Sequence, residues 1–295
     1  MKDYFSNRKT IALLVIPGLA IMLFAIAIPL VISLLLSFVK WTGFGPMKFI
    51  GIENYTRLLK DGLFWRSLYN VFLLIVVTIF VQNMFAFFIA NLLTKISAKT
   101  SQVLRTIFFI PATLSLVVVT RLWVNIFHPM YGMLNKIIHL FGLANFEWAW
   151  LGSIKTAIWS VIWIMIWQGF GWAVLFIYGG LMTVPKELEE AATVDGANTF
   201  NVLRHVTLPC MMPVIQSVII IDIISSLKQM EMVYLSTEGG PGGTTQFLAV
   251  YLYLRAFKYG EYGYGNAISV LFVLIAVFIT LFIQRIFKKS VELIN

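Results

Sequence analysis

The 295-residue sequence is poor in charge, because aspartate, glutamate, lysine and arginine together make up only 12% of it. Soluble domains carry about 25% charged residues. Apolar residues make up 60% of the chain, and its mean hydropathy is +0.88. So few charged side chains cannot cover the surface of a soluble globule. The composition therefore excludes a soluble protein and indicates an integral membrane protein.

The residues that build metal, redox and nucleotide sites are also scarce. Cys210 is the single cysteine, so no intrachain disulfide can form. None of the three histidines has a partner at ligand spacing, which argues against a metal site. No G-x-x-x-x-G-K-[ST] sequence occurs, so the chain does not bind nucleotide through a P-loop. A membrane enzyme would need clustered acids, bases or metal ligands, and no such cluster appears.

The sequence has long apolar stretches instead. A transmembrane helix needs about 20 apolar residues. Six stretches are long enough if one charge each is allowed in Thr106–Phe127 and Val206–Leu227, and they predict spans at approximately 11–39, 67–94, 106–127, 156–182, 209–235 and 264–286. The first is too long for a signal peptide. We therefore expect an all-α membrane protein with six transmembrane helices in a single domain over residues 1–295, with a short external helix at Glu53–Lys60.

The basic residues indicate the orientation of the chain. Lysine and arginine total 22 against 13 acidic residues, a net charge of +9. In a membrane protein such an excess lies at cytoplasmic ends and against anionic lipid, and does not indicate nucleic acid binding. Short basic segments precede the first span, join the second to the third and follow the sixth: Lys2, Arg8, Lys9; Lys95, Lys99, Arg105; Arg285, Lys288, Lys289. The positive-inside rule predicts that both termini are cytoplasmic.

The cytoplasmic segment 184–209, between the fourth and fifth spans, has the pattern of two helices joined by a glycine. Pro185 suits the first turn of a helix, and an acidic first turn follows it. Gly196 stands where that helix ends, since glycine adopts positive φ at little cost. Asn198 can cap a second short helix, and we expect Pro209 to break it before the fifth span. A merely solvated amphipathic loop would fit the same pattern.

This segment also carries a resemblance. Glu190-Ala-Ala-Thr-Val-Asp-Gly-Ala197, followed by Val206-Thr-Leu-Pro209, resembles the EAA loop of binding-protein-dependent ABC importer permeases. Within them it is most similar to the carbohydrate-uptake branch, in the half that resembles the MalF subunit of maltose importers. Weaker similarities are spread over most of the chain, including Phe108–Ala112, Thr237–Pro241 and Tyr262–Tyr264. The eight-span form and large external insertion of the maltose subunit are absent.

The resemblance implies a transport subunit that is not itself an enzyme. Its partners would be a second homologous permease, two ABC ATPase subunits that bind ATP and Mg, and an extracytoplasmic solute-binding protein. The substrate would be a sugar, and specifically an oligosaccharide, carried through the plasma or inner membrane of a prokaryote. The residues implied in ATPase coupling are Glu190, Ala191, Ala192, Asp195, Gly196, Ala197, Leu208 and Pro209. The chain would bind no cofactor of its own.

Polar residues inside the spans are candidates for the substrate pathway. Asp222, Ser225, Ser226 and Gln229 recur at helical spacing on the fifth span. Such a stripe faces either an aqueous path or a partner helix, and both remain open. Further candidates are Asn83 with its neighbour Gln82, Asn125, and Trp163, Trp167 and Gln168 in a tryptophan-rich fourth span. The tryptophans could equally be packing material.

Two charges inside the spans call for partners or a water-lined face. Along straight helices, Asp222 lies about 20 Å beyond Pro209, and Arg121 about 24 Å beyond Arg105, at 1.5 Å per residue. An Arg121–Asp222 ion pair is therefore one hypothesis. The other is that Arg121 extends to the interface while Asp222 faces the pathway. Asp222 could also bind the coupling ion of a secondary transporter, the alternative function, but that class shows related halves, and none is detectable.

Overall fold

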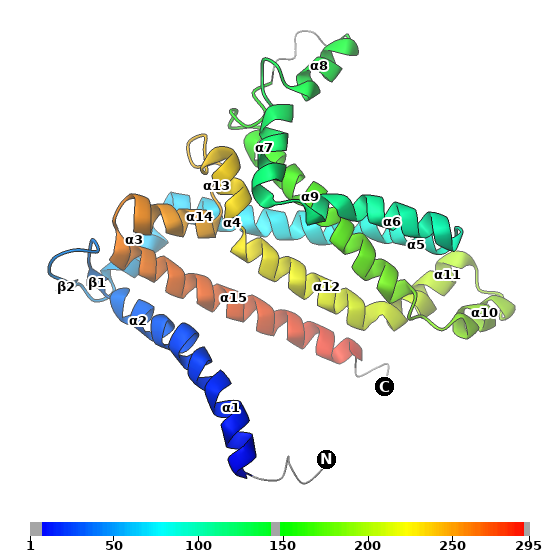
Figure 1. The fold of residues 1–295 in the computed structure, drawn as a ribbon, viewed down its shortest axis with the longest axis horizontal. Coiled ribbons are helices and arrows are strands. Elements are labelled where there is room, and N and C mark those ends of the chain that lie inside the picture. Colours follow the sequence, from blue (N-terminus) through cyan, green and yellow to red (C-terminus); the bar gives the residue numbers. More distant parts are fainter. Residues whose placement is uncertain (1–7, 143–147, 292–295) are drawn as a thin grey trace. The chain divides into compact units, whose positions relative to one another are not determined.

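The computed structural model describes residues 8–142 and 148–291 (Figure 1). Its helices fall into two compact units. The first comprises the chain up to Asp61 together with Leu252–Ile275, and the second comprises Gly62–Tyr251 and the chain from Ala276. The single transmembrane domain stays a prediction, and Lys2 lies outside the described residues.

The first unit begins with an apolar helix that the chain itself leaves uncovered. It runs through α1 (Arg8–Met22), a π-helical turn η1 (Leu23–Ala27) and α2 (Ile28–Leu36). None of its most apolar stretch is buried, so its environment is lipid or another helix. The helix ends before the predicted Val39, because the chain there forms a two-stranded antiparallel sheet. The remaining elements are β1 (Val39–Lys40), β2 (Lys48–Phe49), α3 (Glu53–Leu59) and η4 (Leu254–Lys258). The short helix α3 confirms the expectation for that segment.

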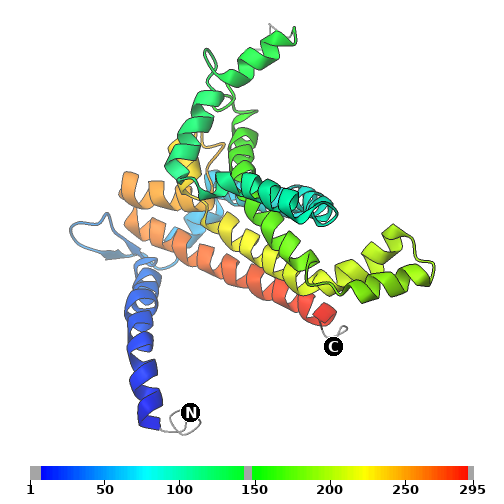
Figure 2. The same cartoon turned by 45° about the vertical axis from the view of Figure 1, so that its right-hand side comes forward.

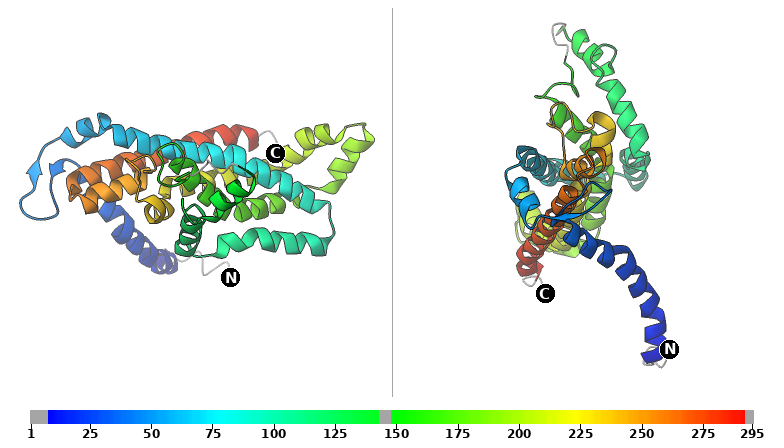
Figure 3. Two further views of the ribbon diagram at one scale, coloured as in Figure 1. Left: turned by 90° about the horizontal axis from the view of Figure 1, so that it is seen from above. Right: turned by 90° about the vertical axis from the view of Figure 1, so that its left-hand side faces the viewer.

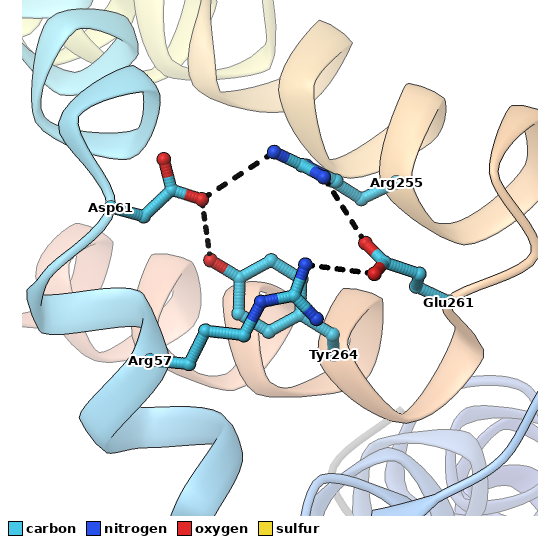
Figure 4. A network of polar contacts seen from close by, with 5 residues as sticks. All are labelled: Arg57, Asp61, Arg255, Glu261 and Tyr264. Atoms are coloured by element: carbon cyan, nitrogen blue, oxygen red, sulfur yellow. Dashed lines mark hydrogen bonds and ion pairs between the residues drawn. The ribbon is translucent and has the colours of Figure 1, made fainter.

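A network of charged side chains connects α3 to the start of α15 (Tyr262–Val291) within this unit (Figure 4). Glu261 accepts hydrogen bonds from Arg57 at 2.7 Å and from Arg255 at 3.2 Å. Arg255 also pairs with Asp61 at 3.6 Å, and the Tyr264 hydroxyl donates to Asp61 at 2.8 Å. The Arg57 guanidinium lies 4.0 Å from the centroid of the Tyr264 ring. Opposite charges alternate around the network, so each carboxylate has a cationic partner.

The second unit is a bundle with short helices attached. Its first helix runs without interruption through α4, η2 and α5, as Gly62–Thr94. The elements are α4 (Gly62–Val77), η2 (Thr78–Gln82), α5 (Asn83–Thr94), α6 (Ala98–Thr113), α7 (Leu116–Ile126), α8 (Met133–Leu140), α9 (Ala157–Leu181), α10 (Lys186–Val194), α11 (Thr199–Val202), η3 (Leu203–Thr207), α12 (Leu208–Lys228), α13 (Glu231–Thr237) and α14 (Leu248–Tyr253). The α10–α11 pair lies at the end of the unit where α5 turns into α6 (Figure 3).

The central helix of this unit is α9, which matches the predicted fourth span. It packs against α5, α6 and α12 (Figure 2). Ala86 and Ala90 of α5 are buried with Val174 and Ile177 of α9 in one cluster. Gly171 lets α6 approach closely, because a Cβ at that position would overlap the Phe108 carbonyl oxygen. Small residues therefore set the helix spacing around α9, as is common in membrane bundles.

The third apolar stretch is not one continuous helix, so the prediction of a single helix over 106–127 is wrong. α6 and α7 meet at an angle of 93°. Leu114 and Ser115 are extended, with ψ of 146° and 138°, and Pro111 has no N–H to continue the helical hydrogen bonds. Among the described residues, five helices are long and apolar enough to span a membrane, or six if this bent pair makes one crossing.

The fifth apolar helix also differs from the prediction. α12 ends at Lys228, short of the predicted position 235, because Gln229 is extended with ψ of 111°. The following residues form the separate helix α13. The second span begins earlier than predicted, at Gly62, and the sixth begins at Tyr262.

Candidate functional site

The 184–209 segment folds as the predicted helix–glycine–helix loop. Gly196 has φ of +87°, the left-handed conformation that ends many helices. The Gly196 N–H donates to the Thr193 carbonyl at 3.0 Å, and the Ala197 N–H donates to the Ala192 carbonyl at 2.9 Å. These two bonds form the Schellman motif that satisfies the last carbonyls of α10. The Asn198 side chain then accepts the Asn201 N–H at 2.9 Å and caps α11.

The second helix of the loop does not stop at Pro209, and the expectation of a break there is wrong. One helix runs from Thr199 to Lys228. A π-helical turn, Leu203–Thr207, precedes the proline, and the Leu208 N–H donates back to the Leu203 carbonyl. Pro209 lies in the first turn of α12, where the π-turn has already shifted the hydrogen-bond register. The loop is therefore joined rigidly to the fifth apolar helix.

A side-chain hydrogen bond fastens the two arms of the loop. The Thr207 hydroxyl, on a buried residue, donates to Glu189 Oε1 at 2.6 Å. This hydrogen bond connects α10 to the helix that continues into α12. Behind it lies a cavity of about 850 Å³ between the loop and the α5–α6 turn, reaching Lys95 and Tyr178.

The outer surface of the loop is exposed and partly apolar. Val194 is 87% exposed and Phe200 64% exposed. Exposed apolar side chains that lie together suit a contact with another protein or with the membrane. Of the predicted coupling residues, Glu190, Ala191, Asp195 and Gly196 are exposed, whereas Ala192, Ala197, Leu208 and Pro209 are half-buried. The first group can touch a partner directly, and Leu208 and Pro209 belong to the helix behind it.

A second feature is a cavity of about 550 Å³ among α4, η2, α9 and α12, here called the membrane cavity. The whole predicted stripe lines it, with Asp222, Ser225 and Ser226 on α12 and Gln229 just beyond the end of that helix. Gln168 and Gln82 line it as well. Asn83 does not line the cavity but donates from Nδ2 to Asp222 Oδ2 at 2.7 Å. The residues thus gather in one place, and their contact with substrate stays a prediction.

Other pathway candidates lie elsewhere. Trp163 and Trp167 pack edge-on against Trp123, with ring centroids 6.2 and 5.4 Å apart. Neither tryptophan lines the membrane cavity, and neither does Asn125, which is exposed.

The ion pair between Arg121 and Asp222 does not form in the structure. Arg121 is exposed, and the ion pairs among the described residues do not include Asp222. The depth argument for the pair fails because the 93° bend lies between Arg105 and Arg121. Rises along two perpendicular helices do not add.

Most lining residues of the membrane cavity were not predicted from the sequence, among them Thr78, Met165 and Met232. Thr78 begins the π-turn that also holds Gln82, and such turns leave no reliable sequence signal. The two methionines are indistinguishable from packing residues in a sequence this apolar.

Known proteins resemble the chain over almost its whole length. The family of binding-protein-dependent transport system inner membrane components matches residues 82–293. YurN, a probable ABC transporter permease protein of Bacillus subtilis, is 32% identical to this chain, in an alignment that covers 97% of this chain and 98% of YurN. The trehalose/maltose transport system permease protein MalF of Thermococcus litoralis is 30% identical, in an alignment that covers 95% of this chain and 94% of that protein.

A solved structure supports the same fold. It is a bacterial alginate ABC transporter in complex with an alginate pentasaccharide-bound periplasmic protein. One of its chains matches with a TM-score of 0.82 and 22% identity, over 98% of this chain and 96% of that one. At this identity the likeness concerns the fold. Together with the family match and the relatives, it means that this chain belongs to the family of binding-protein-dependent transport system inner membrane components.

Proposed function

We propose that the chain is a membrane-spanning subunit of an ABC importer for a sugar, and that it forms half of the translocation pathway. The family membership carries this proposal, together with similarity over nearly the full length to a trehalose/maltose permease. The exposed 184–209 loop and the membrane cavity with its polar stripe supply the two parts that such a subunit needs.

The loop is the contact for an ATPase subunit. Glu190, Ala191, Asp195 and Gly196 face outward beside exposed apolar side chains. Because the loop continues into α12, a movement imposed on it would be transmitted to the helix that bears Asp222. ATP and Mg are bound by two such ATPase subunits, since this sequence has no P-loop. A second, similar permease completes the pathway.

The substrate arrives from outside the cell on a binding protein. The family description supports such a partner, and the similar alginate transporter was solved with a periplasmic protein bound. In this assignment both termini and the 184–209 loop are cytoplasmic, in the plasma or inner membrane of a prokaryote. The substrate is an oligosaccharide that passes through the membrane cavity, where amide and hydroxyl side chains can bond its hydroxyl groups.

Uptake by reconstituted vesicles tests the function. The permease pair and ATPase subunits are placed in liposomes with ATP inside, and the binding protein with labelled maltotriose or trehalose is added outside. We expect accumulation that needs both ATP and the binding protein and that a protonophore does not reduce. Accumulation that follows an ion gradient without ATP would contradict the proposal and favour a secondary transporter. A P-loop lysine variant of the ATPase is the control.

A further inference from the structure

Among the described residues, the lining of the membrane cavity carries a single acidic side chain and no basic one. Of its lining side chains, Asp222 is the single ionisable one. The remainder are amides, hydroxyls and apolar or aromatic groups, among them Gln82, Gln168, Ser225 and Trp172. A ligand inside the cavity therefore meets one carboxylate and no cation from the lining.

The partner of Asp222 is neutral as well. Asn83 Nδ2 donates to Oδ2 at 2.7 Å, which suits a carboxylate because a carboxylate oxygen accepts hydrogen bonds. An amide orients the acid without cancelling its charge. Asn83 Oδ1 is buried and has no hydrogen-bond partner. The Asn83 side chain thus keeps its bond to Asp222 although its own oxygen is left without a donor. The ion pairs of the described residues join other side chains.

The neighbours of Asp222 suit a hydroxylated, uncharged ligand. Ser225 and Ser226 follow it on α12, Gln229 follows just beyond the end of that helix, and all three line the cavity. Gln82, which is 6% exposed, also lines it, as does Gly169. These groups can donate to and accept from sugar hydroxyls, whereas a ligand carboxylate would face an uncompensated like charge.

We propose that Asp222, oriented by Asn83, makes the membrane cavity a charge filter that passes uncharged saccharides and excludes those that carry carboxylate or phosphate groups. The inference rests on the proposed sugar transport, and it adds the chemical class of the substrate. A purely structural contact between α5 and α12 is the competing interpretation. The two interpretations predict different results when the charge is removed and the shape is kept.

A reporter cysteine measures the charge of the cavity directly. In a Cys210→Ser background, Ser225→Cys places a thiol on the cavity lining, at the i+3 position from Asp222. The purified importer is treated with two methanethiosulfonate reagents of similar size, one cationic and one anionic. Each thiolate forms a mixed disulfide and releases methanesulfinate, so the two rates report how each charge enters. The rates require neither sugar nor ATP.

We expect the cationic reagent to react faster. Asp222→Asn should lower the ratio of cationic to anionic rates about tenfold. The Asp222 carboxylate, about 6 Å from the thiol, attracts the cationic reagent and repels the anionic one, and the two Coulomb effects in water multiply in the ratio. Asp222→Glu keeps the negative charge, so it should give the same ratio as the Cys210→Ser, Ser225→Cys protein that retains Asp222. Glu53→Gln removes an exposed carboxylate of α3, outside the cavity, and should leave the ratio unchanged. Gel filtration confirms that each variant is folded.

Three outcomes would overturn the charge filter. They are an unchanged ratio in Asp222→Asn, a ratio in Asp222→Glu that matches Asp222→Asn, and a thiol at position 225 that reacts with neither reagent. Since the proposed sugar transport is judged separately by vesicle uptake, the failure of one is distinguishable from the failure of the other. A charge-selective cavity in a protein that takes up no sugar would disprove the transport proposal alone.

Discussion

At the scale of single residues, Gly196 determines the shape of the 184–209 loop. Its φ of +87° is costly for any residue with a Cβ, by about 1–2 kcal/mol. Among the described residues, and apart from the adjoining backbone and neighbours of Gly196 itself, no atom lies within 4 Å of the position that a Cβ would take. A side chain there would therefore strain the backbone without clashing inside the chain, and any further effect must come from a partner.

We expect Gly196→Asp to leave the protein in the membrane and to abolish uptake, because an acidic side chain would project into the ATPase contact. Membrane fractions analysed by immunoblot, and uptake in vesicles, measure the two effects. Gly45→Asp is a matched control, since Gly45 also has positive φ, +75°, and open space around it. Its uptake should remain near that of the unmodified protein. Normal uptake with normal ATP coupling in Gly196→Asp would show that the loop does not bind an ATPase.

At the scale of elements, the bond between Glu189 and Thr207 couples α10 to α12. A partly buried hydrogen bond of this kind contributes about 1 kcal/mol. We expect Thr207→Val to lower the sugar transported per ATP hydrolysed severalfold, because α10 could then move without the helix behind it. Uptake and ATP hydrolysis are measured in the same vesicles.

Thr183→Val is the control for this substitution. The Thr183 hydroxyl donates to the Gly180 carbonyl at the end of its own helix, so the change removes a similar bond that links no two elements. An unchanged ratio of transport to hydrolysis in Thr207→Val, or an equal loss in Thr183→Val, would contradict a coupling role for the Glu189–Thr207 bond.

The elements also show what the sequence can reveal. The 184–209 loop was predictable because Gly196 and Asn198 act through local backbone chemistry, which a sequence displays. The bend between α6 and α7 was not, because Leu114 and Ser115 lie in an apolar stretch and Pro111 alone did not indicate a break. The Asn83–Asp222 bond joins residues 139 positions apart. Sequence identified both as polar residues within spans, but pairing them required the packing of the Gly62–Thr94 helix against α12.

At the scale of the whole molecule, the number of crossings decides on which side the 184–209 loop lies. Starting from a cytoplasmic N-terminus, four crossings before the loop return it to the cytoplasm, where ATP is found. If the α6–α7 pair entered and left the membrane on one side, only three crossings would precede the loop. It would then face outward and could not meet an ATPase. The 93° bend is compatible with either path.

Cysteine labelling distinguishes the two paths. In a Cys210→Ser background, Lys48→Cys, Lys99→Cys and Met130→Cys each place one thiol at an exposed position. Helix Gly62–Thr94 separates the first two, so a membrane-impermeant maleimide on intact spheroplasts should label Lys48→Cys and should reach Lys99→Cys only after permeabilisation. Met130, 85% exposed beyond α7, is decisive. Labelling of Met130→Cys on intact spheroplasts means that the bent pair crosses the membrane and that the loop is cytoplasmic. Labelling only after permeabilisation would put the loop outside, and the importer function could not stand.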